Sequence, residues 1–323
     1  MPELSRVRRH IDRILATQPP RAGSLAITVF GDCISQQGDS VWLGSLVDVM
    51  AAFGLNARQV RTAIFRLRQD GWLTSQQLGR RSYYRLSESG QCQYERAAAR
   101  IYAGAPAPWD GKWILVMPDR IESSTREELR KRLGWLGFGM LTGGVMAHPR
   151  IDRGLLADTL TELGLSDHVI VWRARLDSDV KLHGLVHGAW QLDDLQARYR
   201  SFIADFSPFR KLLAGGRMPA EQDAFILRSL LVHQYRRILL RSTDLPTALL
   251  PRRWCGHTAM DLVRDLYCAL HAPASHYACA RLSNAAGCLP PPSTAFYQRL
   301  GGLSAGSLRD TSLRTATVQN FVA

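Results

Sequence analysis

The sequence has little lysine and no long hydrophobic run, and both shortages narrow the class of protein. Only four of the 41 basic residues are lysine, and the others are arginine. No apolar stretch approaches the roughly 20 residues that a membrane-spanning helix requires. The first residues also lack the apolar core of a signal peptide. We therefore expect a cytoplasmic protein that does not enter a membrane.

The spacing of the cysteines and the absence of catalytic motifs exclude several further classes. The six cysteines are scattered and form no CxxC pair, which favours reduced thiols over a disulfide framework or a zinc site. The chain contains no glycine-rich phosphate loop, nucleophile elbow or Ser/His/Asp arrangement. The sequence thus predicts no catalytic residue, no metal site and no cofactor, and it favours a protein that is not an enzyme.

The charge of the chain favours a polyanionic partner. The formal net charge is +13 and the isoelectric point is near 10.0. Such a surplus is typical of proteins that bind nucleic acid or anionic membranes. An arginine- and alanine-rich composition can also reflect a GC-rich genome, and the surplus is spread along the whole chain. Charge therefore supports nucleic-acid binding without locating it.

Residues 56–86 predict a basic helix, a turn and a two-stranded hairpin. Asn56 can cap the helix, and apolar residues at three- and four-residue spacing up to Leu67 would form its buried face. Two helices are expected before it, one capped by Ser24 and one that buries Trp42. This order of elements is that of a winged helix-turn-helix, a fold whose commonest use is to place one helix in the major groove of DNA.

The polar side chains of this segment are the predicted contacts to DNA. Arginine and glutamine in the first half of the helix suit base edges, because they make bidentate contacts to guanine and adenine. Arginines at the tip of the hairpin suit phosphates, which position a protein without reading sequence. The predicted DNA-binding residues are Arg58, Gln59, Arg61, Thr62, Arg66, Arg80, Arg81 and Arg85. Protein contacts, or an ordinary surface helix, are the alternative interpretations.

The central part of the chain predicts a ferredoxin-like α+β sandwich. A strand, a helix, one strand or a bent pair, a second helix and a closing strand follow one another over residues 109–180. A linker of alanine and proline, residues 103–108, precedes it. Asp119 follows the first strand, where a carboxylate could hold Mg²⁺ for phosphodiester cleavage. The alternative function is therefore a metal-dependent nucleic-acid-processing enzyme, although a lone aspartate after a strand is usually a turn residue.

The last part of the chain predicts mainly helices. The helix Leu227–Arg241 is apolar yet carries a histidine and several arginines, which would either meet an anionic ligand or extend to solvent from a core helix. Residues 281–323 are rich in small polar residues and include three consecutive prolines, so we expect them to be disordered. The whole chain is predicted as a multidomain α+β protein, with domains at residues 1–103, 109–180 and 185–280.

Three segments, taken in order, resemble the PaaX-type repressors of phenylacetate catabolism. RQVRTAIFRLRQDGWL and GRRSYYRLSESG resemble the N-terminal domain of that family. WDGKWILVMPDR and GWLGFGMLTGGVMAHP resemble its middle segment, which is similar to small ferredoxin-like CRISPR-associated nucleases. The stretch from Leu231 to Leu270 resembles its C-terminal signature. The resemblance covers roughly residues 24–280.

This resemblance implies a dimeric repressor on a two-fold symmetric double-stranded DNA operator. Family members release DNA when they bind an aryl-CoA thioester, typically phenylacetyl-CoA, so residues 185–280 would bind the effector and form the dimer. The effector residues this suggests are His233, Tyr235, Arg236, Arg237, Arg241 and Trp254. Two departures, Cys255 in place of an expected proline and the unfamiliar stretch after Arg281, leave open a different acyl-CoA.

Overall fold

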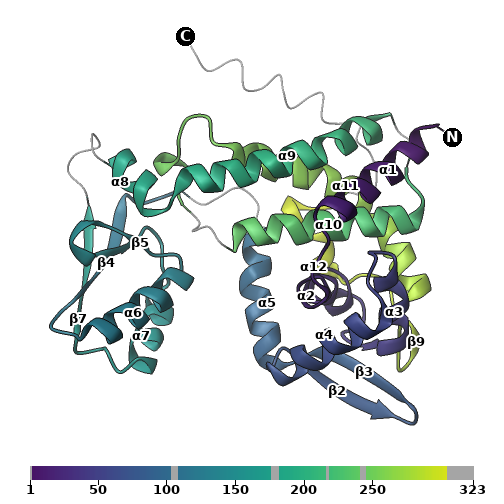
Figure 1. The fold of residues 1–323 in the computed structure, drawn as a ribbon, viewed down its shortest axis with the longest axis horizontal. Helices are drawn as coiled ribbons and strands as arrows, with labels where there is room; N and C mark the ends of the chain where they lie inside the picture. Colours follow the sequence, from purple (N-terminus) through teal and green to yellow (C-terminus); the bar gives the residue numbers. More distant parts are fainter. Residues whose placement is uncertain (1, 103–107, 176–181, 216–217, 241–244, 304–323) are drawn as a thin grey trace. The chain divides into compact units, whose positions relative to one another are not determined.

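The structure is a computed structural model that describes residues 2–102, 108–175, 182–215, 218–240 and 245–303 (Figure 1). It divides into two compact units. The first unit comprises Met1–Gly104, Phe202–Arg236 and Thr258–Ala323, and the second comprises Ala105–Ser201 and Arg237–His257. Most of the predicted linker, residues 103–107, lies outside the described residues. No helix in the described ranges is both long enough and apolar enough to cross a membrane.

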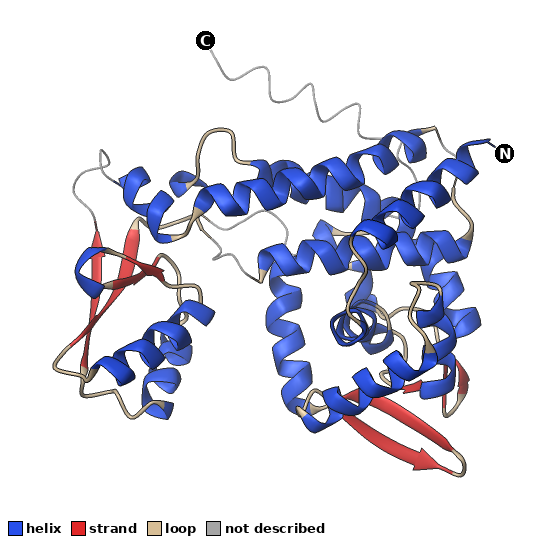
Figure 2. Cartoon of the chain, viewed as in Figure 1, coloured by secondary structure: helices blue, strands red, loops and turns tan. Residues whose placement is uncertain are grey.

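Helices make up most of the first unit (Figure 2). Those of its N-terminal part are α1 (Pro2–Thr17), α2 (Ala22–Asp32), the short η1 (Ile34–Gln36), α3 (Leu43–Ala51), α4 (Ala57–Gln69) and α5 (Glu88–Ile101). Three long helices contribute residues to both units: α9 (Leu192–Ala214), α10 (Glu221–Leu239) and α11 (Cys255–Arg281). Helix α1 belongs to the core of the first unit, since Val7, Ile11 and Ile14 are buried.

A small antiparallel sheet completes the N-terminal part, and it corrects one prediction. Its strands are β1 (Val41–Trp42), β2 (Leu73–Leu78) and β3 (Arg81–Leu86), in the order β1-β3-β2. Trp42 is extended in β1 and pairs with Tyr83, so the expected helix around it begins one residue later. Residues 79 and 80 form the turn of the β2–β3 hairpin, and the φ of 59° at Gly79 favours glycine there.

The two predicted helix caps have different outcomes. Helix α2 begins at Ala22, two residues before Ser24, and no side chain caps it, so the Ser24 cap was wrong. The Asn56 cap of α4 is confirmed. Asn56 Oδ1 accepts a hydrogen bond from the Gln59 amide at 2.9 Å, and Gln59 Oε1 accepts one from the Asn56 amide at 2.9 Å. This reciprocal capping box fixes the first turn of α4.

Residues 282–303 pack against the first unit, contrary to the expected disorder. They form β8 (Ser283–Asn284), β9 (Gly287–Cys288), α12 (Thr294–Tyr297) and η4 (Arg299–Gly301). Phe296 and Leu300 are buried, and the Ser293 amide donates to the Gln36 carbonyl at 2.8 Å. A few apolar anchors thus order a stretch whose average composition is polar. The rest of the predicted tail, residues 304–323, lies outside the described residues.

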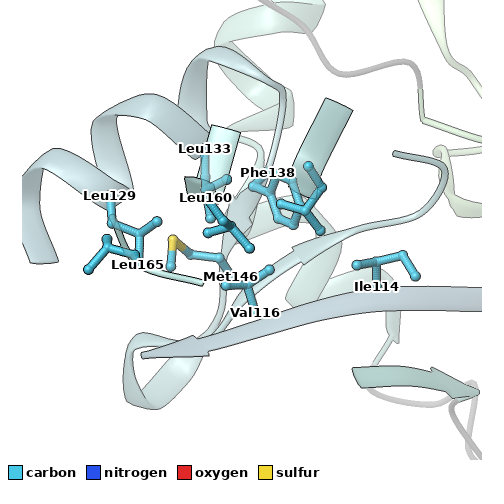
Figure 3. Close-up of a cluster of buried hydrophobic side chains, with 9 residues drawn as sticks. Ile114, Val116, Leu129, Leu133, Phe138, Met146, Leu160 and Leu165 are labelled. Carbon is cyan, nitrogen blue, oxygen red and sulfur yellow. The ribbon is translucent and has the colours of Figure 1, made fainter. Parts of the chain in front are cut away.

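The second unit is built around a four-stranded antiparallel sheet. Its elements are β4 (Lys112–Pro118), α6 (Ser123–Trp135), β5 (Gly139–Met140), η2 (Thr142–Gly144), β6 (Met146–His148), α7 (Arg153–Glu162) and β7 (Val169–Arg175). The strand order is β5-β6-β4-β7, and the possible single strand over residues 138–147 is a bent pair. Figure 3 shows the core of this unit, where Val116, Leu133 and Leu160 meet between the sheet and helices α6 and α7.

The boundaries of the compact units differ from the predicted domains. Helix α8 (Leu182–Ala189) and the start of α9 belong with the central sheet and not with the later helices. Trp190 explains this: its Nε1 donates to the Gly137 carbonyl at 3.0 Å, and its ring covers Gly139 so closely that a Cβ there would clash. The 3₁₀ turn η3 (Thr247–Leu249) also lies in this unit. Each unit is therefore built from more than one segment of the chain, whereas the prediction assumed one uninterrupted segment for each domain.

Candidate nucleic-acid interface

Helix α4 has one buried face and one exposed face. Val60 and Ile64 are fully buried, and the helix packs against α2 and α3. Leu67, the third residue of the predicted stripe, is partly buried. Most of the remaining positions face solvent, because residues three and four apart share a face of a helix. The apolar residues of α4 therefore pack against the helical core, and its arginines lie at the surface.

All eight residues predicted to contact DNA are exposed. They are Arg58, Gln59, Arg61, Thr62 and Arg66 on α4, Arg80 in the hairpin turn, and Arg81 and Arg85 on β3. In the described part of the chain, no acidic side chain pairs with Arg58, Arg61 or Arg66. A guanidinium without an acidic partner keeps its donors available for an anion. Helix α4 and the β2–β3 hairpin lie next to each other in the first unit and together form a cationic surface (Figure 1).

Two of the eight residues are already engaged with other groups. The Gln59 side-chain oxygen is held in the capping box, so a bidentate contact to adenine would require this hydrogen bond to open. The guanidinium of Arg81 lies 4.7 Å from the ring centroid of Trp42, a cation–π contact that orients it beside β1. Arg58, Arg61 and Arg66 show no such engagement among the described residues.

A second group of arginines is buried in the first unit and was missed by the sequence analysis. Arg228 of α10 and Arg299 of η4 both form ion pairs with Asp32 at the end of α2, at 3.0 and 3.1 Å. All three side chains are at least 90% buried. Buried charges require partners, so this cluster ties α2, α10 and the C-terminal segment together. The signal in the sequence was charge inside apolar runs: LAITVFGD for Asp32 and AFILRSLLV for Arg228.

Three tyrosines complete the buried cluster. Tyr102 and Tyr267 donate to Asp32 Oδ1 at 2.5 and 2.7 Å, and Arg299 donates to Tyr267 and Tyr94 at 2.9 and 2.7 Å. Burial raises the pKa of all three phenols, that of Tyr94 to about 12. The phenols therefore remain protonated and can donate at neutral pH. Helix α5 reaches the cluster because Gly31 leaves room for the Tyr94 ring, which a Cβ would occupy.

The predicted effector residues fall into different environments. His233 and Tyr235 are buried in the first unit, and His233 Nδ1 lies 3.1 Å from Thr28 Oγ1. Arg236 donates to the carbonyl and hydroxyl of Ser24 at 3.0 and 3.2 Å.

The other predicted effector residues lie outside the first unit. Arg237 is exposed and Trp254 is buried against Tyr199, and both belong to the second unit. Arg241 lies outside the described residues. The contacts of His233 and Arg236 thus link α10 to α2.

Asp119, the residue of the alternative enzyme hypothesis, is exposed directly after β4. Its amide donates to the His168 carbonyl at 2.9 Å, which extends the β4–β7 pairing by one residue beyond the strand ends. Across the described ranges, no group of three or more histidine, cysteine, aspartate or glutamate side chains is arranged to hold a metal ion. Asp119 therefore belongs to no such group among the described residues.

An exposed cationic helix, held by an apolar face and flanked by an arginine-bearing hairpin, defines a surface suited to a polyanion. Residues 21–90 match the model of the PaaX-like protein family, residues 106–186 match the PaaX protein central Cas2-like domain, and residues 190–280 match the PaaX-like protein C-terminal domain. The chain belongs to the PaaX family. The predicted resemblance is confirmed over all three segments.

Two individual proteins illustrate the similarity. The chain is 36% identical over 306 residues to the transcriptional repressor PaaX of Escherichia coli, covering 93% of this chain and 96% of that protein. The solved structure of the uncharacterized protein Rv0674 from Mycobacterium tuberculosis has a TM-score of 0.51 and 22% identity, covering 76% of this chain and 94% of that one. The second match concerns the fold alone.

Proposed function

We propose that this chain is a DNA-binding transcriptional repressor of a phenylacetate catabolic operon. Two findings support it: the similarity to a transcriptional repressor over nearly the whole chain, and the exposed arginines of α4 and the β2–β3 hairpin. In this proposal residues 22–86 act as a winged helix-turn-helix, in which α3 and α4 are the helix pair and the hairpin is the wing. The central unit is a ferredoxin-like domain, which fits the strand order β5-β6-β4-β7.

Within this proposal the two parts of the cationic surface have different tasks. Arg58, Arg61 and Thr62 lie on the first two turns of α4, where a recognition helix meets base edges. Arg80 and Arg85 on the wing meet phosphates, which hold the domain in register along the duplex. Base contacts give sequence preference, and phosphate contacts give affinity that falls as salt rises.

The test of this function is DNA binding by the full-length protein. Fluorescence anisotropy would be measured on DNA from upstream of its own gene and on a scrambled duplex of equal length and composition. The expected result is tighter binding to the natural duplex, with affinity that falls steeply between low and moderate salt. Equal affinity for both duplexes, or binding that ignores salt, would reject sequence-specific repression.

We further propose that an aryl-CoA thioester such as phenylacetyl-CoA releases the protein from DNA. The hydrogen bonds from Arg236 to Ser24 and between His233 and Thr28 join α10 to α2, and α2 packs against α4. A ligand that displaces α10 would therefore disturb the helix on which the recognition helix rests. Release requires that the ligand bind the DNA-incompetent state more tightly than the DNA-bound state.

The effector proposal is tested with Arg237, which is exposed. The Arg237→Ala variant should bind DNA as the unchanged protein does and require more phenylacetyl-CoA for release. Arg130→Ala, a change at an exposed arginine of α6, is the matched control and should leave both properties unchanged. Normal release in the Arg237 variant would remove this residue from the effector site.

We also propose that the protein acts as a homodimer on a two-fold symmetric operator. A two-fold protein favours a palindromic site, with half-sites about one helical turn apart. Light scattering with and without the operator duplex measures the stoichiometry directly. One protomer per duplex would exclude the symmetric arrangement.

A further inference from the structure

Phe65 is an apolar side chain exposed in the middle of the cationic surface. It lies on α4 and is 51% exposed, whereas Val60 and Ile64 of the same helix are fully buried. A single exposed apolar residue is common on protein surfaces and needs no explanation by itself. Its position on the helix is the informative observation.

Phe65 lies on the face of α4 that points away from the core. A rotation of about 100° per residue places it on one face with Arg58 and Thr62, about 100° from Ile64 and about 140° from Val60 around the helix. The guanidinium of Arg68 lies 5.9 Å from the centroid of the phenyl ring. Arginines without acidic partners therefore surround an apolar group that is not part of the core.

The charge around Phe65 identifies the kind of partner that would cover it. Arg58, Arg61 and Arg66 are exposed on the same helix, and their donors are suited to a polyanion. The edges of DNA bases in the major groove offer one prominent apolar group, the C5-methyl group of thymine. A phenyl ring among arginines matches a thymine methyl bordered by phosphates and polar base edges.

We propose that Phe65 contacts the C5-methyl group of a thymine in the major groove and is a specificity-determining residue. This inference rests on the proposed DNA-binding function. With a rise of 1.5 Å per residue, Phe65 lies about 10 Å along the helix axis from Arg58. In this proposal each half-site contains a thymine that lies beyond the base contacted by Arg58, toward the C-terminal end of α4.

The test replaces single thymines by uracil, which removes only the methyl group. The duplex would be one that the full-length protein selects from a random library, so that no operator has to be known. We expect uracil at one position of a single half-site to weaken binding about fourfold, the effect of losing one buried methyl group. Uracil at the other thymines should have little effect.

Two variants decide whether Phe65 is responsible. The Phe65→Ala variant should bind more weakly and lose the response to uracil at that position. Its thermal midpoint should not fall, because Phe65 is half exposed and alanine is a better helix former. The matched control Arg66→Ala should bind more weakly yet keep the full response to uracil.

The outcomes separate this inference from the function on which it rests. Failure to select any consensus sequence would reject the DNA-binding function itself. A consensus with no uracil-sensitive position, or a response that persists in Phe65→Ala, would overturn the role of Phe65 and leave the repressor function standing. Loss of self-association in Phe65→Ala, with the response to uracil unchanged, would assign the ring to a protein contact and overturn the inference as well.

Discussion

The first unit uses arginine in two opposite environments. On α4 and the β2–β3 hairpin the arginines are exposed, and Arg58, Arg61 and Arg66 have no acidic partner among the described residues. In the core, Arg228 and Arg299 are at least 90% buried and share Asp32 with two tyrosines, Tyr102 and Tyr267. The exposed group leaves its donors available for a partner, whereas the buried group uses several of its donors inside the fold.

This comparison shows that charge alone does not mark function. A count of arginines treats Arg228 and Arg61 equally, although one is a structural group and the other is a candidate DNA contact. Burial and partners separate them, because a desolvated guanidinium is tolerated only beside a compensating acid. The two groups should therefore respond differently to mutation: the buried group through stability and the exposed group through DNA affinity.

The largest expected effect comes from Asp32→Asn, which leaves the buried Arg228 and Arg299 without their acidic partner. Breaking a buried ion pair by removing one partner typically costs about 3–5 kcal/mol. Urea denaturation measures this as a lower free energy of unfolding. Asp194→Asn, which removes the exposed acidic partner of Arg198, is the control and should cost less than about 1 kcal/mol. Equal losses in both variants would contradict the distinction between buried and exposed arginines.

The next effect is that of Arg61→Ala on the exposed group. If Arg61 reads a base, specific DNA binding should weaken by about 1–3 kcal/mol, while the free energy of unfolding stays the same. Titration by fluorescence anisotropy, combined with urea denaturation, measures both quantities. The same change at Arg130, an exposed arginine of α6, should alter neither. Unchanged affinity in Arg61→Ala would remove this residue from the interface.

The exposed group was predictable from the sequence because local patterns determine it. Asn56 as a cap, the apolar residues Val60 and Ile64, and Gly79 in a hairpin turn each act within a few residues. Because Val60 and Ile64 form the buried face of α4, the arginines between and beside them must lie on the exposed face. The strand and helix order of the central unit follows in the same way from short alternating patterns.

The buried group was not predictable, since it depends on contacts between distant segments. Asp32, Arg228 and Arg299 are separated by roughly 70 to 270 residues along the chain. The polar composition after Arg281 predicted disorder, yet Phe296 and Arg299 anchor that stretch in the core. Trp190 likewise assigns α8 to the central sheet through a single side chain. The average composition of a sequence segment does not reveal a single side chain that holds the segment in the core.

A smaller effect is expected for Asn56→Ala, which removes the cap of the helix that presents the exposed group. Loss of an N-cap costs about 1 kcal/mol of stability. It also releases Gln59 and loosens the first turn of α4, so DNA affinity should fall as well. Asp152→Ala is the matched control: Asp152 caps α7 in the second unit, so its loss should lower stability similarly and leave DNA binding intact. Equal DNA binding by both variants would argue that the first turn of α4 does not reach DNA.

The smallest effect should come from Arg80→Ala at the tip of the hairpin. A phosphate contact adds affinity for every sequence equally, so the ratio between specific and non-specific binding should stay constant. The informative quantity is the slope of log affinity against log salt, which should become less steep by about one for each protomer bound. A changed sequence preference with an unchanged slope would instead mean that Arg80 contacts a base edge. The exposed arginines would then form one base-reading set rather than a base-reading helix and a phosphate-binding wing.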